Sequence, residues 1–121
     1  MIAPRRIGLL LLVAWCLCCG PGARDKALRG SLLAVDASAA AFVTYNRDHQ
    51  RRIVDEAATY DDGLSRLNAW HQEREPVLDG IRVAYRLIAL ATLDKDASLD
   101  DVLRAVRELA ADVSKLTGGG P

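Results

Sequence analysis

The sequence predicts an all-α protein in which a long antiparallel helical hairpin and a shorter third helix form a three-helix bundle behind an N-terminal signal segment. Three observations support this fold class. Apolar residues recur at alternating steps of three and four along most of the chain, which is the spacing of one face of an α-helix. Polar, helix-breaking residues interrupt that spacing near residues 60 and 95. A basic and then strongly apolar stretch comes before the first helix.

Residues 1 to 19 have the layout of an export signal. Arg5 and Arg6 form a short basic start, residues 7 to 15 are apolar, and small residues follow at 20 to 22. The apolar stretch is about half of the roughly 20 residues that a membrane-spanning helix needs. We therefore interpret residues 1 to 19 as a signal peptide and expect the mature protein to work outside the cytoplasm.

The cysteines decide how the signal is interpreted. All three lie at positions 16 to 19, whereas a disulfide framework needs cysteines spread through the folded part. One interpretation is a bacterial lipoprotein whose lipidated first residue is Cys19, because a small residue precedes it and the flexible residues 20 to 22 follow. Residues 16 to 18 depart from the Leu-small-small-Cys pattern of such signals. The alternatives are cleavage without a lipid before Ala23 and an uncleaved anchor.

The first long helix is predicted over residues 27 to 58, after a flexible tether at residues 20 to 26. The residues of its seam are Leu28, Leu32, Val35, Ala39, Phe42, Asn46, His49, Ile53 and Ala57. The second is predicted over residues 60 to 93. Its seam contains Leu64, Leu67, His71, Arg74, Leu78, Ile81, Tyr85, Ile88 and Thr92. Thr59 with Asp62 three residues later resembles a capping box, which marks the start of the second helix.

These two seams pair layer by layer if the chain turns back at Tyr60. The pairing places Phe42 opposite Leu78 and Val35 opposite Tyr85. A rival register continues the first seam through Gly63, Leu67, Trp70, Arg74, Val77, Ile81 and Ala84, as one unbroken helix in a parallel dimer would. Poor helix formers at residues 59 to 63 and a kinking proline, Pro76, favour the hairpin.

The third helix is predicted over residues 98 to 117. Ser98 with Asp101 resembles a second capping box. The apolar face of this helix contains Leu99, Val102, Val106, Leu109, Val113 and Leu116. From Leu99 to Leu116, at 1.5 Å per residue, this face is about 27 Å long, so the helix covers only the open half of the hairpin and leaves the tip, from about residue 47 to residue 74, uncovered. Residues 118 to 121 are predicted to be a disordered tail.

Two polar layers are predicted where that cover ends, with Asn46 opposite Arg74 and His49 opposite His71. Polar layers often fix the register of paired helices. Facing histidines are also potential ligands for a divalent metal, although no third ligand is evident. We predict no bound metal or cofactor and no catalytic residue, because no nucleophile with a base and oxyanion donors can be recognised.

The charge balance argues against nucleic acid as a partner. The chain has 16 basic and 16 acidic residues and no basic stripe of the kind that follows a phosphate backbone. Tyr60 and Trp70 fall on the uncovered tip, where aromatic residues either anchor a partner or fill the packing between two helices.

The sequence therefore predicts a noncatalytic exported protein of the bacterial cell envelope, either tethered to the membrane by a lipid on Cys19 or free in the periplasm. It would present its helical tip to an unidentified envelope protein. The alternative is a small exported metal-binding or hydrolytic protein that uses His49 and His71.

Overall fold

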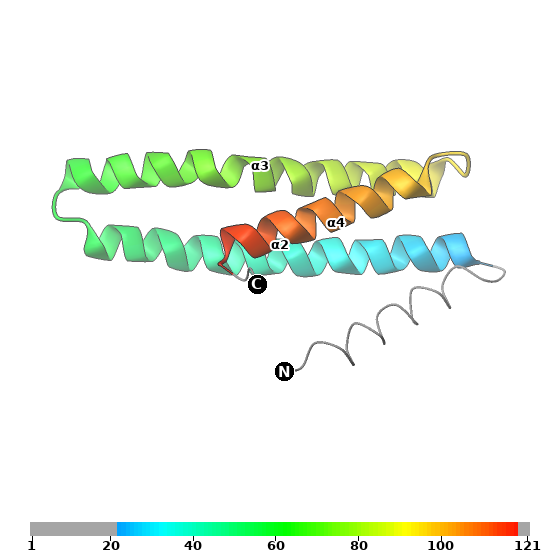
Figure 1. The fold of residues 1–121 in the computed structure, drawn as a ribbon, viewed down its shortest axis with the longest axis horizontal. Coiled ribbons are helices and arrows are strands. Elements are labelled where there is room, and N and C mark those ends of the chain that lie inside the picture. Colours follow the sequence, from blue (N-terminus) through cyan, green and yellow to red (C-terminus); the bar gives the residue numbers. More distant parts are fainter. Residues whose placement is uncertain (1–21, 119–121) are drawn as a thin grey trace, which may run out of the picture.

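The computed structural model describes residues 22 to 118, which form three α-helices packed against one another. Helix α2 spans Ala23–Glu56, α3 spans Tyr60–Leu93 and α4 spans Leu99–Leu116. The long helices α2 and α3 run antiparallel, and α4 lies diagonally across the open half of their hairpin (Figure 1). The all-α three-helix arrangement is confirmed. The predicted signal peptide and Cys19 lie outside the described residues.

Helix α2 begins four residues earlier than predicted. Residues 23 to 26, expected to belong to the tether, form its first turn, after Gly22 in the left-handed conformation (φ 78°). The Arg24 guanidinium donates to the carbonyls of Ala91 (3.1 Å), Asp94 (3.1 Å) and Ala97 (2.9 Å). Carbonyls at a helix C-terminus lack intrahelical partners and carry partial negative charge, so this contact holds the start of α2 against the end of α3.

The hairpin turn is formed by residues 57 to 59. Thr59 Oγ1 accepts a hydrogen bond from the Asp62 backbone N–H (3.1 Å), and Asp62 Oδ2 accepts one from the Ala58 N–H (3.2 Å). This reciprocal pair satisfies donors at the helix start. Helix α3 continues through Pro76 without ending, so the turn and not the proline breaks the helical rod. The single-helix alternative is wrong.

The face that α3 buries differs from the predicted seam. The residues of α3 that are buried are Gly63, Trp70, Val77, Ala84, Ile88 and Ala91. This is largely the register that the sequence assigns to the rival fold. Leu64 is 45 % exposed and His71 is exposed. The predicted layers therefore need correction: α3 is rotated so that the large Trp70 side chain is removed from water, and Leu78 and Tyr85 lie at the margin of the core.

The connected hydrophobic core occupies only the open half of the hairpin. Its members are Leu28, Val35, Phe42, Val77, Ala84, Ile88, Ala91, Val102, Leu109 and Val113. Helix α4 starts at Ser98, whose Oγ accepts from the Asp101 N–H (3.2 Å), and ends before Gly118 in the left-handed conformation (φ 71°). Ile53 and Trp70 are buried outside this core. The tip is thus a two-helix projection, as predicted.

Candidate interaction site at the hairpin tip

A polar and aromatic layer closes the base of the tip. Asn46 Oδ1 accepts hydrogen bonds from Trp70 Nε1 (2.8 Å) and from the Arg74 guanidinium (2.9 Å). The His49 ring lies against Trp70, with 4.2 Å between centroids, and Tyr45 stacks on His49 at 5.5 Å. The predicted contact between Asn46 and Arg74 is present. It is organised by Trp70, which the sequence analysis did not assign to this layer.

The structure does not bring the two histidines face to face. His49 lies on Trp70, and its buried Nδ1 has no hydrogen-bond partner among the described residues. His71 is exposed and lines a surface hollow with Arg47 and Gln50. The predicted His49–His71 layer is wrong because the rotation of α3 turns Trp70, one residue earlier, toward α2. Within residues 22 to 118, no group of three or more His, Cys, Asp or Glu side chains is placed to hold a metal ion.

The two aromatic residues predicted to anchor a partner differ in their exposure to solvent. Trp70 is 3 % exposed and its indole N–H is occupied, so it packs the tip internally and is not available at the surface. Tyr60 is 83 % exposed at the first position of α3. The anchor role predicted for Trp70 therefore needs correction, whereas Tyr60 remains accessible.

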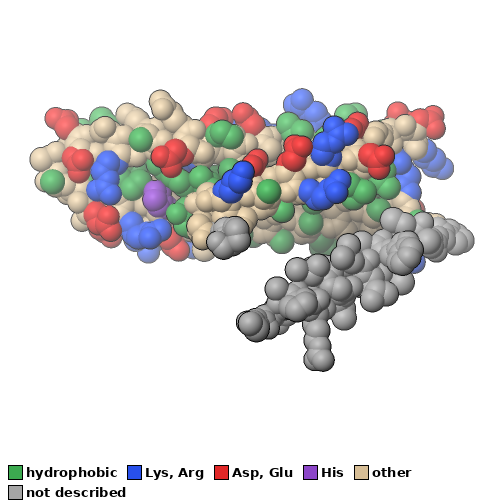
Figure 2. Space-filling model, in the orientation of Figure 1, with side chains coloured by type: hydrophobic (Ala, Val, Ile, Leu, Met, Phe, Trp, Pro, Cys, Tyr) green, Lys and Arg blue, Asp and Glu red, His purple; other side chains and the backbone are tan. Residues whose placement is uncertain are grey.

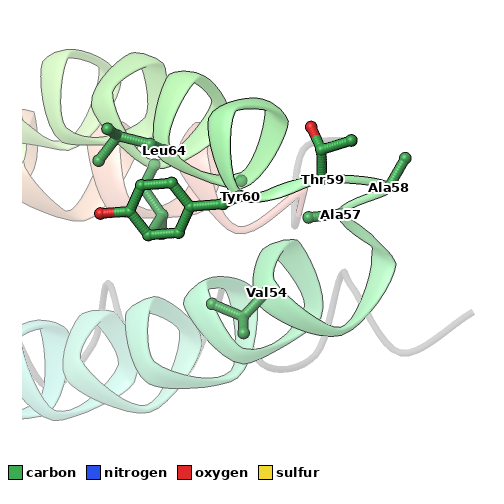
Figure 3. Close-up of a pocket in the computed structure, with 8 residues that line it drawn as sticks. Val54, Ala57, Ala58, Thr59, Tyr60 and Leu64 are labelled. Atoms are coloured by element: carbon green, nitrogen blue, oxygen red, sulfur yellow. The ribbon is translucent and has the colours of Figure 1, made fainter.

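An apolar hollow of about 570 Å³ opens at the tip (Figure 3). The residues that line it are Val54, Ala57, Ala58, Thr59, Tyr60, Gly63, Leu64 and Leu67. Val54 lies on α2, across the hairpin from Tyr60 and Leu64 on α3. Val54 and Leu64 are 60 % and 45 % exposed. Large aliphatic side chains gathered in this way at a surface are typical of an interaction site.

A second hollow, of about 410 Å³, continues along the hairpin from the first. It shares Val54 and Leu67 with the apolar hollow and adds Arg47, Gln50, Arg51, Asp55 and His71. We call the two hollows together the tip groove. Its end at the turn is apolar and its inner end is mainly basic, so it is suited to binding a ligand with both properties.

The sequence analysis missed Val54 and Leu64 as members of this site. A signal was present for Val54. It follows the seam residue Ile53 directly, and neighbouring residues of a helix point about 100° apart, so Val54 had to face away from the seam. Leu64 was assigned to the seam itself, and only the rotation of α3 places it at the surface.

Away from the tip groove, charge is mixed. Figure 2 shows acidic and basic side chains interspersed over the face that carries α4. Helix α2 is long and apolar enough to cross a membrane by length and composition alone, and about a fifth of its most apolar stretch is buried in the fold (22 %). Core helices and signal sequences have the same property, so this composition agrees only weakly with a membrane-directed N-terminal region.

No protein-family model, curated protein or solved structure matches this chain. The role of the tip groove is therefore argued from its own geometry and chemistry.

Proposed function

We propose that this chain is a noncatalytic protein of the bacterial cell envelope that is anchored by a lipid on Cys19 and presents its hairpin tip to a protein partner. The observation that carries the proposal is the exposed apolar cluster of Val54, Tyr60 and Leu64 around the tip hollow. Tyrosine is enriched among residues that dominate binding energy at protein interfaces.

The position of the tip relative to Cys19 supports this role. Helix α2 begins at Ala23, four residues after Cys19, so a lipid on Cys19 would keep the open end of the bundle close to the membrane. The 34 residues of α2 extend about 51 Å at 1.5 Å per residue. An anchored chain can therefore hold its tip well clear of its own membrane, where a protein partner is accessible.

Intact-mass spectrometry of the protein isolated from bacterial membranes tests the anchor. The expected mature chain begins at Cys19 and carries acyl chains, each methylene of which adds about 0.8 kcal/mol of membrane binding. The Cys19→Ser variant should move to the soluble fraction. A mature chain that begins at Ala23 without a lipid, or membrane retention that survives Cys19→Ser, would contradict the anchor.

Site-directed photo-crosslinking in intact cells tests the partner. A photoreactive residue in place of Tyr60 should give a discrete protein adduct. The same residue in place of Val83, which is 48 % exposed on α3 and does not line the tip groove, is the matched control. The partner proposal fails if position 60 gives no protein adduct, or if the adducts at both positions are the same.

A further inference from the structure

Helix α4 shows what kind of element the pair of long helices accepts. Val102, Leu109 and Val113 of α4 are at most 6 % exposed and join the core that α2 and α3 form. The polar side of α4 carries charged residues such as Asp101 and Arg104, which are exposed and paired with each other (3.1 Å). An amphipathic helix is therefore the natural occupant of a groove between α2 and α3.

The tip groove is a second groove between the same two helices, and α4 contributes no residue to it. Its two hollows share Val54 and Leu67 and follow one another along the hairpin. From Arg47 to Val54 the groove extends about 10 Å along α2, and from Val54 to the turn it is lined mainly by apolar residues. A groove that spans at least two helical turns can accommodate a short helix.

The basic end of the tip groove indicates the charge of the ligand that it can bind. Arg47 and Arg51 are one turn apart on α2, and neither forms an ion pair with the described residues. His71 is next to them, and Asp55 is the one carboxylate that lines the groove among residues 22 to 118. Guanidinium groups bind carboxylates through paired, charge-assisted hydrogen bonds. The two arginines outnumber Asp55, so this end favours an anionic group.

We infer that the tip groove binds an amphipathic helix of the partner protein, with apolar side chains against Val54, Tyr60 and Leu64 and an acidic side chain at Arg47 and Arg51. This inference rests on the proposed function. Val54 and Arg47 are seven residues apart, or about 10 Å along the helix axis. The acidic residue of the bound helix should therefore follow or precede its apolar anchor by about seven residues. The distance of the tip from its own membrane favours a protein helix over an anionic lipid.

Selection from an mRNA-display library of helix-forming peptides, each about as long as the 18 residues of α4, tests the inference on the full chain. Enriched peptides should combine apolar residues at helical spacing with Asp or Glu about two turns away. The affinity of an enriched peptide should fall about tenfold or more in Leu64→Asp and in Arg47→Glu, since each removes one of the two attractions. Val83→Asp, a substitution at a similarly exposed site outside the groove, should leave the affinity unchanged.

A charge swap makes the test specific. Replacing the acidic residue of the peptide with Lys should weaken binding to the wild-type chain, and the Arg47→Glu/Arg51→Glu double variant should restore it. Circular dichroism of each variant checks that the helices persist, since every substitution is at an exposed position. Peptides that lack an acidic preference, or binding that none of the groove substitutions reduces, would overturn the inference.

A lipid or a second copy of this chain in the tip groove would give different experimental results. Binding to vesicles of phosphatidylethanolamine and phosphatidylglycerol that Leu64→Asp abolishes would assign the groove to lipid. A dimer in sedimentation equilibrium that the same substitution dissociates would assign it to a second copy of this chain. Either result overturns the acidic-helix inference. If the protein adduct at position 60 forms equally in Arg47→Glu, the partner proposal stands and the acidic-helix inference fails. The two proposals can therefore fail independently.

Discussion

At the scale of single residues, the tip depends on Asn46. One amide oxygen accepts from both the Trp70 indole and the Arg74 guanidinium, and both donors lie where α4 no longer covers the hairpin. A buried donor that loses its acceptor has neither water nor a protein group to bond with, and this destabilises the folded state. Asn46 therefore matters more to the tip than its small size suggests.

Asn46→Ala should reduce the free energy of unfolding by about 2 to 3 kcal/mol, since it leaves an indole N–H and a charged donor unpaired. Urea unfolding followed by the fluorescence of Trp70 measures this loss. Asn68→Ala, at an exposed position of α3, is the control and should have little effect. Equal losses in the two variants would show that the layer does not stabilise the tip.

Tyr85 and Asp36 link α3 to α2 on the surface of the hairpin. The Tyr85 hydroxyl donates to the Asp36 carboxylate, and this hydrogen bond, helped by partial burial and by the negative charge of Asp36, raises the pKa of Tyr85 above its usual value of 10.0. The folded-state pKa exceeds the unfolded one, so the contribution to stability is complete below about pH 10 and is lost as pH rises through the folded pKa.

Asp36→Asn should lower the pKa of Tyr85 back toward 10, because it removes the charged acceptor. Titration of the Tyr85 ring carbon bonded to the hydroxyl oxygen, followed by NMR, measures the shift, and alkaline unfolding of the wild-type chain and Tyr85→Phe measures its effect on stability. An unchanged pKa in Asp36→Asn would mean that this hydrogen bond does not persist in solution.

At the scale of helices, the first turn of α3 packs closely against the hairpin turn at Gly63. A Cβ added at Gly63 would lie 3.2 Å from the Ala57 Cβ, whereas one added at Gly30, also within a helix, would meet nothing within 4 Å. A contact of 3.2 Å is tighter than carbon atoms usually make, so Ala57 would have to move by a few tenths of an ångström to admit a side chain at Gly63. The space at Gly30 is open.

Gly30→Ala should raise the free energy of unfolding by about 1 kcal/mol, the difference in helix propensity between the two residues. Gly63→Ala gains the same propensity but must displace Ala57 in the turn, so its net gain should be smaller or negative. Thermal unfolding of both variants makes the comparison. Equal stabilisation by the two substitutions would show that Gly63 and Ala57 are not in close contact.

The partial cover by α4 also sets how stability is distributed along the hairpin. The connected core lies between residues 28 and 42 of α2 and between residues 77 and 91 of α3. Segments with few buried apolar contacts open more readily than the core. The tip should consequently be the softest part of the described fold.

Hydrogen exchange should be faster in residues 47 to 69 than in residues 28 to 42. The difference in exchange rate should be the same at pH 7.5 and pH 5.5, since His49 and His71 do not face each other in this structure. Backbone amide exchange followed by mass spectrometry at both pH values measures it. Equal protection of the two segments would contradict a soft tip.

At the scale of the whole molecule, stability is concentrated in one core formed by all three helices. Phe42 is 2 % exposed and belongs to that core, whereas its neighbour Val43 is 59 % exposed. A domain of this size has only about 5 to 15 kcal/mol of net stability. One large cavity in the core should therefore affect the entire bundle.

Phe42→Ala should cost about 3 to 5 kcal/mol and should release α4 together with the open half of the hairpin. Val43→Ala, one position along the same helix, should cost far less, since most of its side chain is already in water. Urea unfolding monitored by far-UV circular dichroism distinguishes them. Similar costs for the two substitutions would place the core elsewhere.

The sequence was enough to predict the class of fold, the order and approximate bounds of the helices, the caps at Thr59 and Ser98, and the uncovered tip. These features depend on local spacing, on backbone donors near each helix start and on helix length, all of which are visible along the chain. The metal alternative at His49 and His71 required the two side chains to face each other across the hairpin, and local signals in the sequence do not specify such a pairing.

The face that α3 buries could not be predicted from the sequence, because it depends on how all three helices pack together. Two adjacent stripes, one through Leu64, His71 and Leu78 and one through Gly63, Trp70 and Val77, both follow the helical spacing. The choice depends on the simultaneous packing of Trp70 against Asn46 and of α4 against one side of both long helices. That choice buries Trp70, exposes Leu64 and His71, and creates the tip groove, because rotation of a helix exchanges the residues on its buried and exposed faces.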